Sequence, residues 1–214
     1  MAKPKGAGLV IIHQEDKNVS ILIGKSNSSI PYKKDVWLFP GGHSHDDELP
    51  YETAYREFIE EVFNVIIPQH VIKEIISAII EDKSLYPIKT TVPNTDDRPS
   101  FTFMQSSDVL TIIVNILKKY NIQCDVFPFG YNGLYNVEYK INIYQFCLQR
   151  RYITEPVSIE KNELVFITLI PIKNIIYSIN SANKKMNIYH YHQENLRVYV
   201  PYVIKNIDRY FLNL

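Results

Sequence analysis

The feature that most constrains this chain of 214 residues is a fixed spacing of one glycine, four acids and one arginine in its first third. Five residues separate the glycine from the first glutamate. Seven more precede an Arg-Glu pair, and a Glu-Glu pair follows after two intervening residues. At ordinary residue frequencies, six such matches should arise by chance in roughly one in 10⁵ chains of this length. The residues are Gly42, Glu48, Arg56, Glu57, Glu60 and Glu61.

The segment that carries most of these residues, Pro50 to Val62, is predicted to be a helix. Pro50 is tolerated near a first helical turn, Glu52 suits the positive N-terminal end, and no glycine interrupts the run. At about 100° per residue, its apolar residues cover one arc. The opposite arc, which should face solvent, carries Glu57, Glu60 and Glu61.

A shared face of carboxylates is typical of a divalent cation site. Glu57 and Glu61 lie one turn apart, where like charges repel, and a cation would convert that repulsion into binding. Hard ions such as Mg²⁺ take oxygen ligands, and the absence of a side chain at Gly41 lets a main-chain carbonyl approach as well. The alternative is a solvated acidic face on which Arg56 pairs with Glu60.

The spacing resembles the box of the Nudix hydrolase family, Gly-x5-Glu-x7-Arg-Glu-U-x-Glu-Glu-x-Gly-U, in which U is a bulky aliphatic residue. Two positions depart from it, because Phe63 replaces the last glycine and Asn64 replaces the last aliphatic residue. Asn adopts the left-handed conformation of a helix cap more easily than most residues. We therefore expect Asn64 to cap the helix one residue late, and Phe63→Gly to be tolerated or mildly stabilising.

The resemblance implies roles for individual residues. It implies that Mg²⁺ or Mn²⁺ is bound by Glu57, Glu60 and Glu61 with the backbone of Gly41. These three glutamates and Glu163 are then the expected catalytic residues. Glu163 is included because a further glutamate in this family often precedes a strand, and Glu160 is close behind it. The expected supporting residues are Gly42, Glu48 and Arg56.

The resemblance also implies an α/β fold, the Nudix-type α/β/α sandwich with a mixed sheet. The apolar runs 6–14 and 19–24 predict a hairpin, and the run 164–172 predicts a central strand. Helical spacing over 194–212 predicts a C-terminal packing helix. We expect residues 1–214 to form one domain, with a helical insertion at 68–125 after the box helix. Within that insertion, the polar stretch 81–107 is expected to be a long loop that selects the substrate.

Composition limits the function classes. Lys plus Arg equals Asp plus Glu at 23 each, so net charge gives no support to a protein that coats nucleic acid. The start of the chain has no apolar leader, and no apolar run approaches 18 residues. We expect no membrane association and a cytoplasmic location, which is the host cytoplasm if the chain is viral. Length and composition are also similar to the small Nudix proteins of large DNA viruses.

The expected reaction is metal-dependent hydrolysis of the diphosphate linkage between a nucleoside diphosphate and another moiety. ADP-ribose-like molecules are the preferred substrates in this interpretation. Capped RNA, decapped with release of m7GDP, is the first alternative. The second is a catalytically idle module that binds nucleotides or RNA. The expected partner is thus a nucleotide-type small molecule or a capped RNA.

Overall fold

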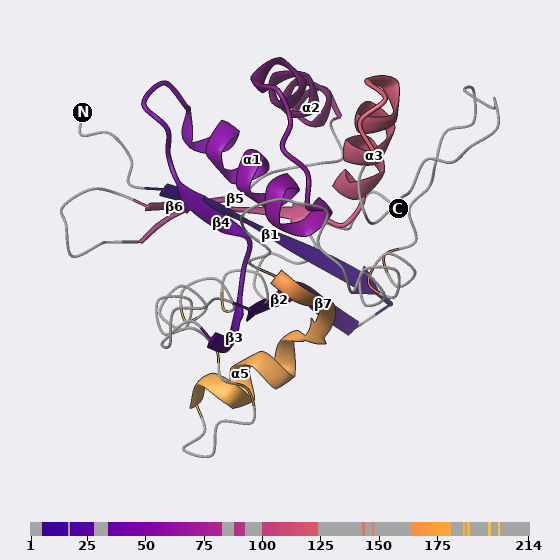
Figure 1. The fold of residues 1–214 in the computed structure, drawn as a ribbon. Helices are drawn as coiled ribbons and strands as arrows, with labels where there is room; N and C mark the ends of the chain where they lie inside the picture. Colours follow the sequence, from indigo (N-terminus) through magenta and orange to yellow (C-terminus); the bar gives the residue numbers. More distant parts are fainter. Residues whose placement is uncertain are drawn as a thin grey trace.

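The protein is described from a computed structural model (Figure 1). The structure describes residues 6–16, 18–27, 34–82, 88–92, 100–123 and 164–180, and the single positions 143, 147, 186, 188, 197 and 201.

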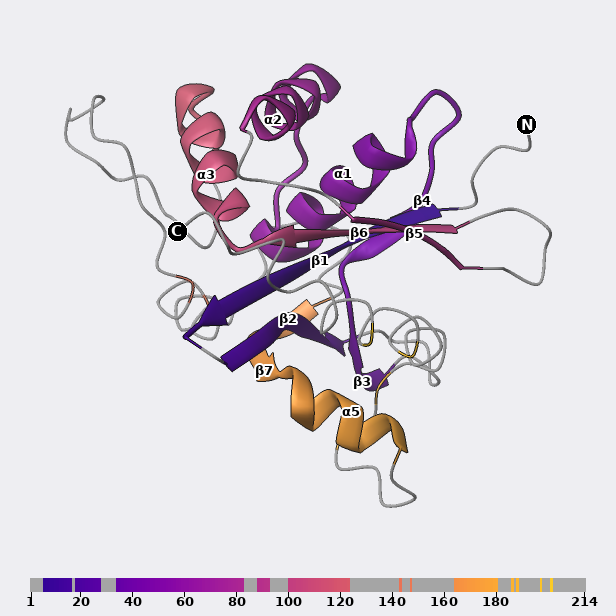
Figure 2. The ribbon, with the colours of Figure 1, turned by 180° about the vertical axis from the view of Figure 1, so that it is seen from behind.

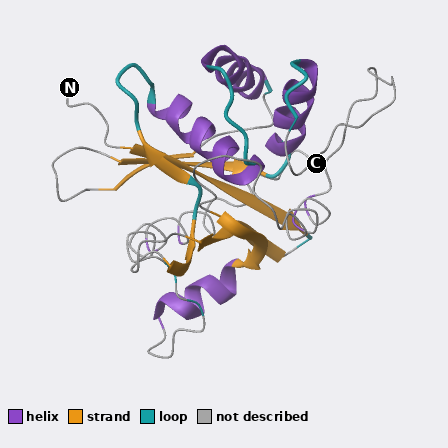
Figure 3. Ribbon diagram, in the orientation of Figure 1, coloured by secondary structure: helices purple, strands orange, loops and turns teal. Residues whose placement is uncertain are grey.

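A mixed sheet of seven strands forms the centre of the described structure (Figure 3). The strands are β1 (Gly6–Glu15), β2 (Asn18–Asn27), β3 (Lys34–Leu38), β4 (Gly41–His43), β5 (Ile88–Val92), β6 (Ser100–Ser106) and β7 (Leu164–Pro171). Their order is β3-β2-β1-β6-β5, with β4 also paired to β1 and β7 also paired to β2. The β1–β6 pair is parallel and the other pairs are antiparallel, which confirms the expected mixed sheet.

Helices cover both faces of this sheet, as expected for an α/β/α sandwich. One face carries α1 (Pro50–Phe63), α2 (Gln69–Glu81) and α3 (Val109–Lys119), whereas α5 (Ile172–Asn180) lies on the other (Figures 1 and 2). Alternate residues of β1 supply the two cores. Leu9 and Ile11 pack in the cluster that includes α1, α2 and α3, and Val10 and Ile12 pack in the cluster that includes α5.

The predicted hairpin at the start of the chain is confirmed. Strands β1 and β2 pair in register from Ile12 opposite Ile21 to Glu15 opposite Asn18. The connection is therefore two residues long, and such short turns require positive φ angles. Asp16 supplies one at 53°, a conformation that aspartate tolerates better than most residues.

The predicted box helix is also confirmed, and it runs one residue further than expected. Its apolar arc is fully buried against the sheet, with Tyr55 and Phe58 among the largest buried side chains. At its start, the Leu49 amide donates to a Glu52 carboxylate oxygen at 2.9 Å, which satisfies one N-terminal donor. At its end, Asn64 adopts φ 55° and ψ 46°, which is the predicted left-handed cap.

The expectation for Phe63→Gly is wrong. Phe63 is the last residue of α1, is 0% exposed, and packs edge-on against Phe58 at 6.2 Å between ring centroids. The left-handed conformation falls on Asn64, so a glycine at position 63 would relieve no backbone strain. It would instead remove a large side chain from the core.

The expectation of one long loop over 81–107 is also wrong. Residues 88–92 form β5 and residues 100–106 form β6, which lies beside β1 inside the sheet. In β6, Phe103 is buried on one face of the sheet and Met104 on the other. The polar, proline-punctuated composition concealed these strands. The segment 68–125 thus supplies sheet strands as well as the expected helices, and the one-domain assignment for 1–214 stays a prediction.

Several predictions fall outside the part of the chain that the structure describes. Glu160 and Glu163 precede β7 but are not among the described residues. Of the C-terminal helix expected over 194–212, Arg197 and Pro201 are described and are helical. No helix within the described ranges is long and apolar enough to cross a membrane.

Candidate functional site

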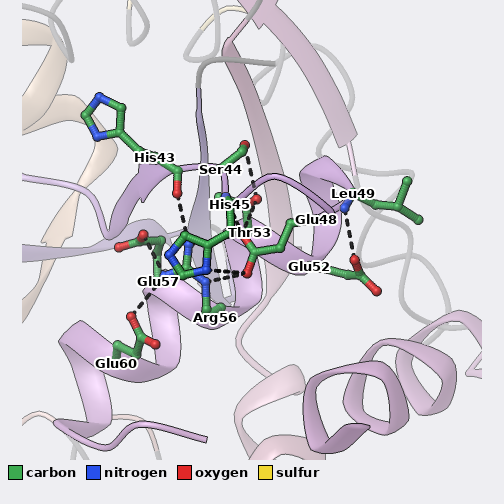
Figure 4. Close-up of polar contacts among 10 residues, drawn as sticks. All are labelled: His43, Ser44, His45, Glu48, Leu49, Glu52, Thr53, Arg56, Glu57 and Glu60. Atoms are coloured by element: carbon green, nitrogen blue, oxygen red, sulfur yellow. Dashed lines mark hydrogen bonds and ion pairs between the residues drawn. The ribbon is translucent and has the colours of Figure 1, made fainter. Parts of the chain in front are cut away.

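The residues of the box meet where α1 packs against β4 and β1. Strand β4 pairs with the first residues of β1, and the loop 44–49 then leads directly into α1. Figure 4 shows the backbone carbonyl of His43 in β4, the Glu48 side chain from this loop, and Glu57 and Glu60 of α1 around the guanidinium group of Arg56. The sequence spacing thus corresponds to one compact cluster.

Arg56 is the centre of the cluster and uses all five of its N–H donors. Its Nε and Nη2 groups bind the two oxygens of Glu48 at 2.5 and 3.1 Å. Its Nη1 group binds Glu57 at 2.8 Å and Glu60 at 3.0 Å, and Nη2 also donates to the His43 carbonyl at 2.9 Å. A guanidinium has five donors in a fixed planar fork, so this set of acceptors leaves none unused.

Glu48 is the principal partner of Arg56. Its side chain is 7% exposed, and its Oε2 atom accepts hydrogen bonds from the Thr53 hydroxyl, the His45 amide and Arg56. Burial by itself would raise the pKa of Glu48, but the hydrogen bonds from Arg56, His45 and Thr53 outweigh it and lower the pKa below its usual value. Glu48 therefore stays ionised. Burial by itself would lower the pKa of Arg56, but the hydrogen bonds to Glu48 and the negative charges of Glu57, Glu60 and Glu48 outweigh it and raise the pKa.

Glu57 and Glu61 lie against the two glycines of β4. The Gly41 amide donates to Glu61 Oε2 at 3.0 Å. The Glu57 carboxylate lies over Gly42, where a Cβ atom would collide with it, and a Cβ on Gly41 would lie 2.7 Å from the Cα of Gly8. Gly41 is thus required for the close approach of β1 to β4, whereas a side chain at Gly42 would displace the Glu57 carboxylate.

One expectation for these glutamates is wrong. Glu61 was expected on a solvent-facing arc, but it is 6% exposed, and the Glu57 side chain is only 17% exposed. Their face of α1 is covered because β4 and its glycines pack onto it. Glu60 is the most accessible of the three, at 26% of its side chain.

The cluster has the donor chemistry of a site for a hard cation. Three carboxylates bind one guanidinium, and a fourth, that of Glu61, accepts the Gly41 amide, which leaves an excess of negative charge on oxygen atoms. Within the described ranges, no three His, Cys, Asp or Glu side chains are arranged closely enough to hold an ion. In the present arrangement, the oxygens of Glu57 and Glu60 bind Arg56. The residues fit Mg²⁺ or Mn²⁺ by charge and ligand type.

Sequence reasoning missed two hydroxyl groups at the site. Thr53 is fully buried and contacts both Glu48 and Ser44. A polar residue within the first turns of α1, three positions before Arg56, was the signal that could have revealed it. His45 is 71% exposed beside Glu48, at 3.6 Å, and is thus a loop residue at the rim.

Comparisons with known proteins find similarity over the segment that carries this cluster. A model of the NUDIX domain matches residues 2–101. An RNA pyrophosphohydrolase of Xylella fastidiosa strain M12 is 36% identical over 58 residues, which are 25% of this chain and 30% of that protein. The match thus spans less than a third of that relative's length.

Solved structures give matches of greater extent and lower identity. A binary complex of a C. elegans Ap4A hydrolase aligns at 14% identity and a TM-score of 0.45, covering 94% of this chain and 99% of the other. A mutT/nudix family protein of Listeria innocua aligns at 12% identity and a TM-score of 0.47, covering 96% and 98%.

Proposed function

We propose that this chain is a Nudix hydrolase, on the match of residues 2–101 to the NUDIX domain, and that it hydrolyses a diphosphate linkage in a nucleotide-type substrate with the help of a divalent cation. The observation that carries this proposal is the buried arginine that holds three of the box carboxylates beside the Gly41–Gly42 strand. Several carboxylates held away from water around a single guanidinium carry uncompensated negative charge, which costs free energy unless a bound cation neutralises it.

Glu57, Glu60 and Glu61 would hold the cation, together with the backbone at Gly41. When bound, Mg²⁺ or Mn²⁺ neutralises the diphosphate and activates a water molecule. The chain's own residues set the geometry. Arg56 fixes the orientation of Glu57 and Glu60. A carboxylate oxygen of Glu57 or of Glu163 would accept the proton of the attacking water.

ADP-ribose-like molecules are the substrates we propose first, because the box acts on the diphosphate and leaves the rest of the substrate open. Capped RNA is the second candidate. The specific observation in its favour is the similarity of 58 residues to an RNA pyrophosphohydrolase. A cytoplasmic location and a viral origin remain predictions from sequence.

The decisive experiment measures release of AMP from ADP-ribose, and of m7GDP from capped RNA, with Mg²⁺, with Mn²⁺ and with EDTA. Dinucleoside polyphosphates, NADH and oxidised dNTPs complete the substrate panel. Metal-dependent turnover of any of these supports the proposal. Metal binding without turnover across the whole panel would instead support the idle binding module.

Glu61→Gln is the matched test of the proposed metal site. Glutamine keeps an oxygen that accepts the Gly41 amide but removes the charge, so the fold should survive. We expect the rate to fall by at least about a hundredfold, since changes to residues that only support a metal ligand already cost 10- to 100-fold. Glu81→Gln, at the exposed end of α2, is the control and should leave the rate unchanged. Unimpaired hydrolysis by Glu61→Gln at equal Mg²⁺ would remove Glu61 from the site.

A further inference from the structure

We infer that Thr53 is a positioning residue for the carboxylate cluster, acting through Glu48 on Arg56. This inference rests on the proposed function, because it concerns the same site. Thr53 is the fourth residue of α1, is 0% exposed, and contacts Glu48 and Ser44 through its hydroxyl group.

The direction of the hydrogen bonds follows from counting protons. The Thr53 Oγ1 atom lies 2.9 Å from Glu48 Oε2 and 3.1 Å from Ser44 Oγ, but a hydroxyl group has one proton to donate. Glu48 is ionised and can only accept, so the Thr53 proton points at Glu48. Thr53 Oγ1 then accepts the proton of Ser44. The result is a directed relay from Ser44 through Thr53 to Glu48, which Figure 4 shows at the start of α1.

The relay matters because Glu48 determines the orientation of Arg56. Glu48 Oε2 accepts three donors, and Thr53 Oγ1 makes the shortest of these three contacts. With that atom fixed, the two oxygens of Glu48 present the edge that Arg56 binds in a bidentate manner. The remaining Nη1 group of Arg56 is then directed at Glu57 and Glu60. Removal of one hydroxyl group thus loosens two carboxylates that it does not touch.

Geometry on the helix supports this role. Thr53 precedes Arg56 by three residues and Glu57 by four, so it lies on the same side of α1 as both. Its backbone amide already donates to the Leu49 carbonyl at 3.1 Å, so helix formation makes no demand on the side chain. A valine would fill the same buried volume. The hydroxyl group is therefore the part of Thr53 that the site uses.

Three variants test the relay by activity. Thr53→Val removes the hydroxyl at nearly constant shape, and we expect kcat to fall by about tenfold with KM unchanged, because Thr53 is not one of the residues proposed to hold the cation or the substrate. Thr53→Ser restores the hydroxyl and should recover at least half of kcat. Ser44→Ala removes only the outer member and should lower kcat two- to threefold. Thr111→Val, in α3, is the matched control and should have no effect.

A double mutant separates positioning from a general structural effect. In a Glu48→Gln background, Thr53→Val should cause less than a twofold further loss, because its effect passes through the Glu48 carboxylate. A full additional tenfold loss would contradict the inference. So would a Thr53→Val variant with the kcat of the wild type, or a Thr53→Ser variant as slow as Thr53→Val.

A measurement without substrate keeps the inference separate from the proposed function. The Nε–H proton of Arg56 is hydrogen-bonded to Glu48, so NMR reports its resonance and its exchange with solvent. Thr53→Val should move this resonance and accelerate its exchange at least threefold, whereas Thr53→Ser and Thr111→Val should not. An unchanged Arg56 resonance in Thr53→Val overturns the relay. If the wild-type protein is inactive but Thr53→Val still shifts the Arg56 resonance, only the proposed reaction is overturned.

Discussion

Helix α1 and the pair α2–α3 lie on the same face of the sheet but bury different kinds of residue. The buried set of α1 includes Glu52, Thr53, Arg56 and Glu61, whereas every buried residue of α2 and α3 is aliphatic. Charged residues of α2 and α3 meet on the outside instead, where Lys119 Nζ lies 2.7 Å from a Glu74 oxygen and the Tyr120 hydroxyl binds the same carboxylate.

The ion pairs of the two regions therefore differ in their exposure to solvent. The Arg56 and Glu48 side chains are 9% and 7% exposed, whereas Lys119 and Glu74 are 64% and 31% exposed. Water competes for the outer pair, and such surface pairs contribute little to stability. The inner cluster is held away from water and is expensive to break. Charge on a buried helix face thus indicates a site, and charge on an exposed face indicates only solvation.

The largest effect is expected from Phe63→Gly, at the buried end of α1. Loss of the ring leaves a cavity, and glycine weakens the helix, so we expect a loss of about 4 kcal/mol in the free energy of unfolding. Urea titration followed by circular dichroism measures it. Ile80→Gly, at the exposed end of α2, is the control and should lose only the helix-propensity part, about 1 kcal/mol. Equal losses would mean that α1 and α2 ends are packed alike.

Arg56→Met should follow, with a loss of about 3 kcal/mol, because it leaves Glu48 buried without its ionic partner. Chemical denaturation in EDTA measures it without any contribution from bound cations. Arg56→Lys keeps the charge but has three donors in place of five, so it should recover only part of this loss. Complete recovery by lysine would show that charge alone, and not the planar fork, holds the cluster.

Acid should lower the free energy of unfolding by protonating Glu48, and Glu48→Gln should remove this pH dependence. The folded pKa of Glu48 is lowered, so its contribution is complete above the unfolded pKa of about 4.3 and is lost as the pH falls through the folded value. At pH 7, Glu48→Gln should cost about 2 kcal/mol, the value of a hydrogen bond to a charged group. Unfolding curves of variant and wild type, recorded from pH 7 to pH 3, should converge at the acid end. Parallel curves would exclude Glu48 as the titrating group.

The smallest effect is expected from Glu74→Gln, which breaks the outer pair between α2 and α3. Both partners are solvated, so the thermal midpoint should stay within the scatter of replicate melts. A loss as large as that of Glu48→Gln would erase the contrast between the two regions.

Sequence alone predicted the parts of this molecule that depend on local signals. The hairpin, the box helix, its cap at Asn64 and strand β7 all follow from short-range periodicity and turn chemistry. The spacing and its resemblance to the Nudix box also led us to expect that Glu48, Arg56, Glu57 and Glu60 belong to one site, and the structure brings them together. Strands β5 and β6 were not predicted, because the pairing of β6 with β1 is made by a distant part of the chain that no local pattern reports.

Burial of polar residues was the other quantity that local patterns could not supply. Helical periodicity placed Glu61 opposite the apolar arc and so predicted exposure. Strand β4 covers that face, and only the fold brings the Gly41 amide to the Glu61 carboxylate. Thr53 and Ser44 were missed for the same reason, since their contact joins a loop to a helix turn.

The parallel pairing of β1 with β6 also constrains how the protein is made. The hydrogen bond between His13 and Ser107 joins residues that are 94 positions apart, at the ends of these two strands. On a ribosome that adds 5 to 20 residues per second, roughly 5 to 20 s pass between synthesis of the two ends. During translation, β1 can pair with β2 at once, but its other edge must wait for β6. Until β6 is made, that edge leaves backbone N–H and C=O groups of β1 unpaired and open to pairing with another chain.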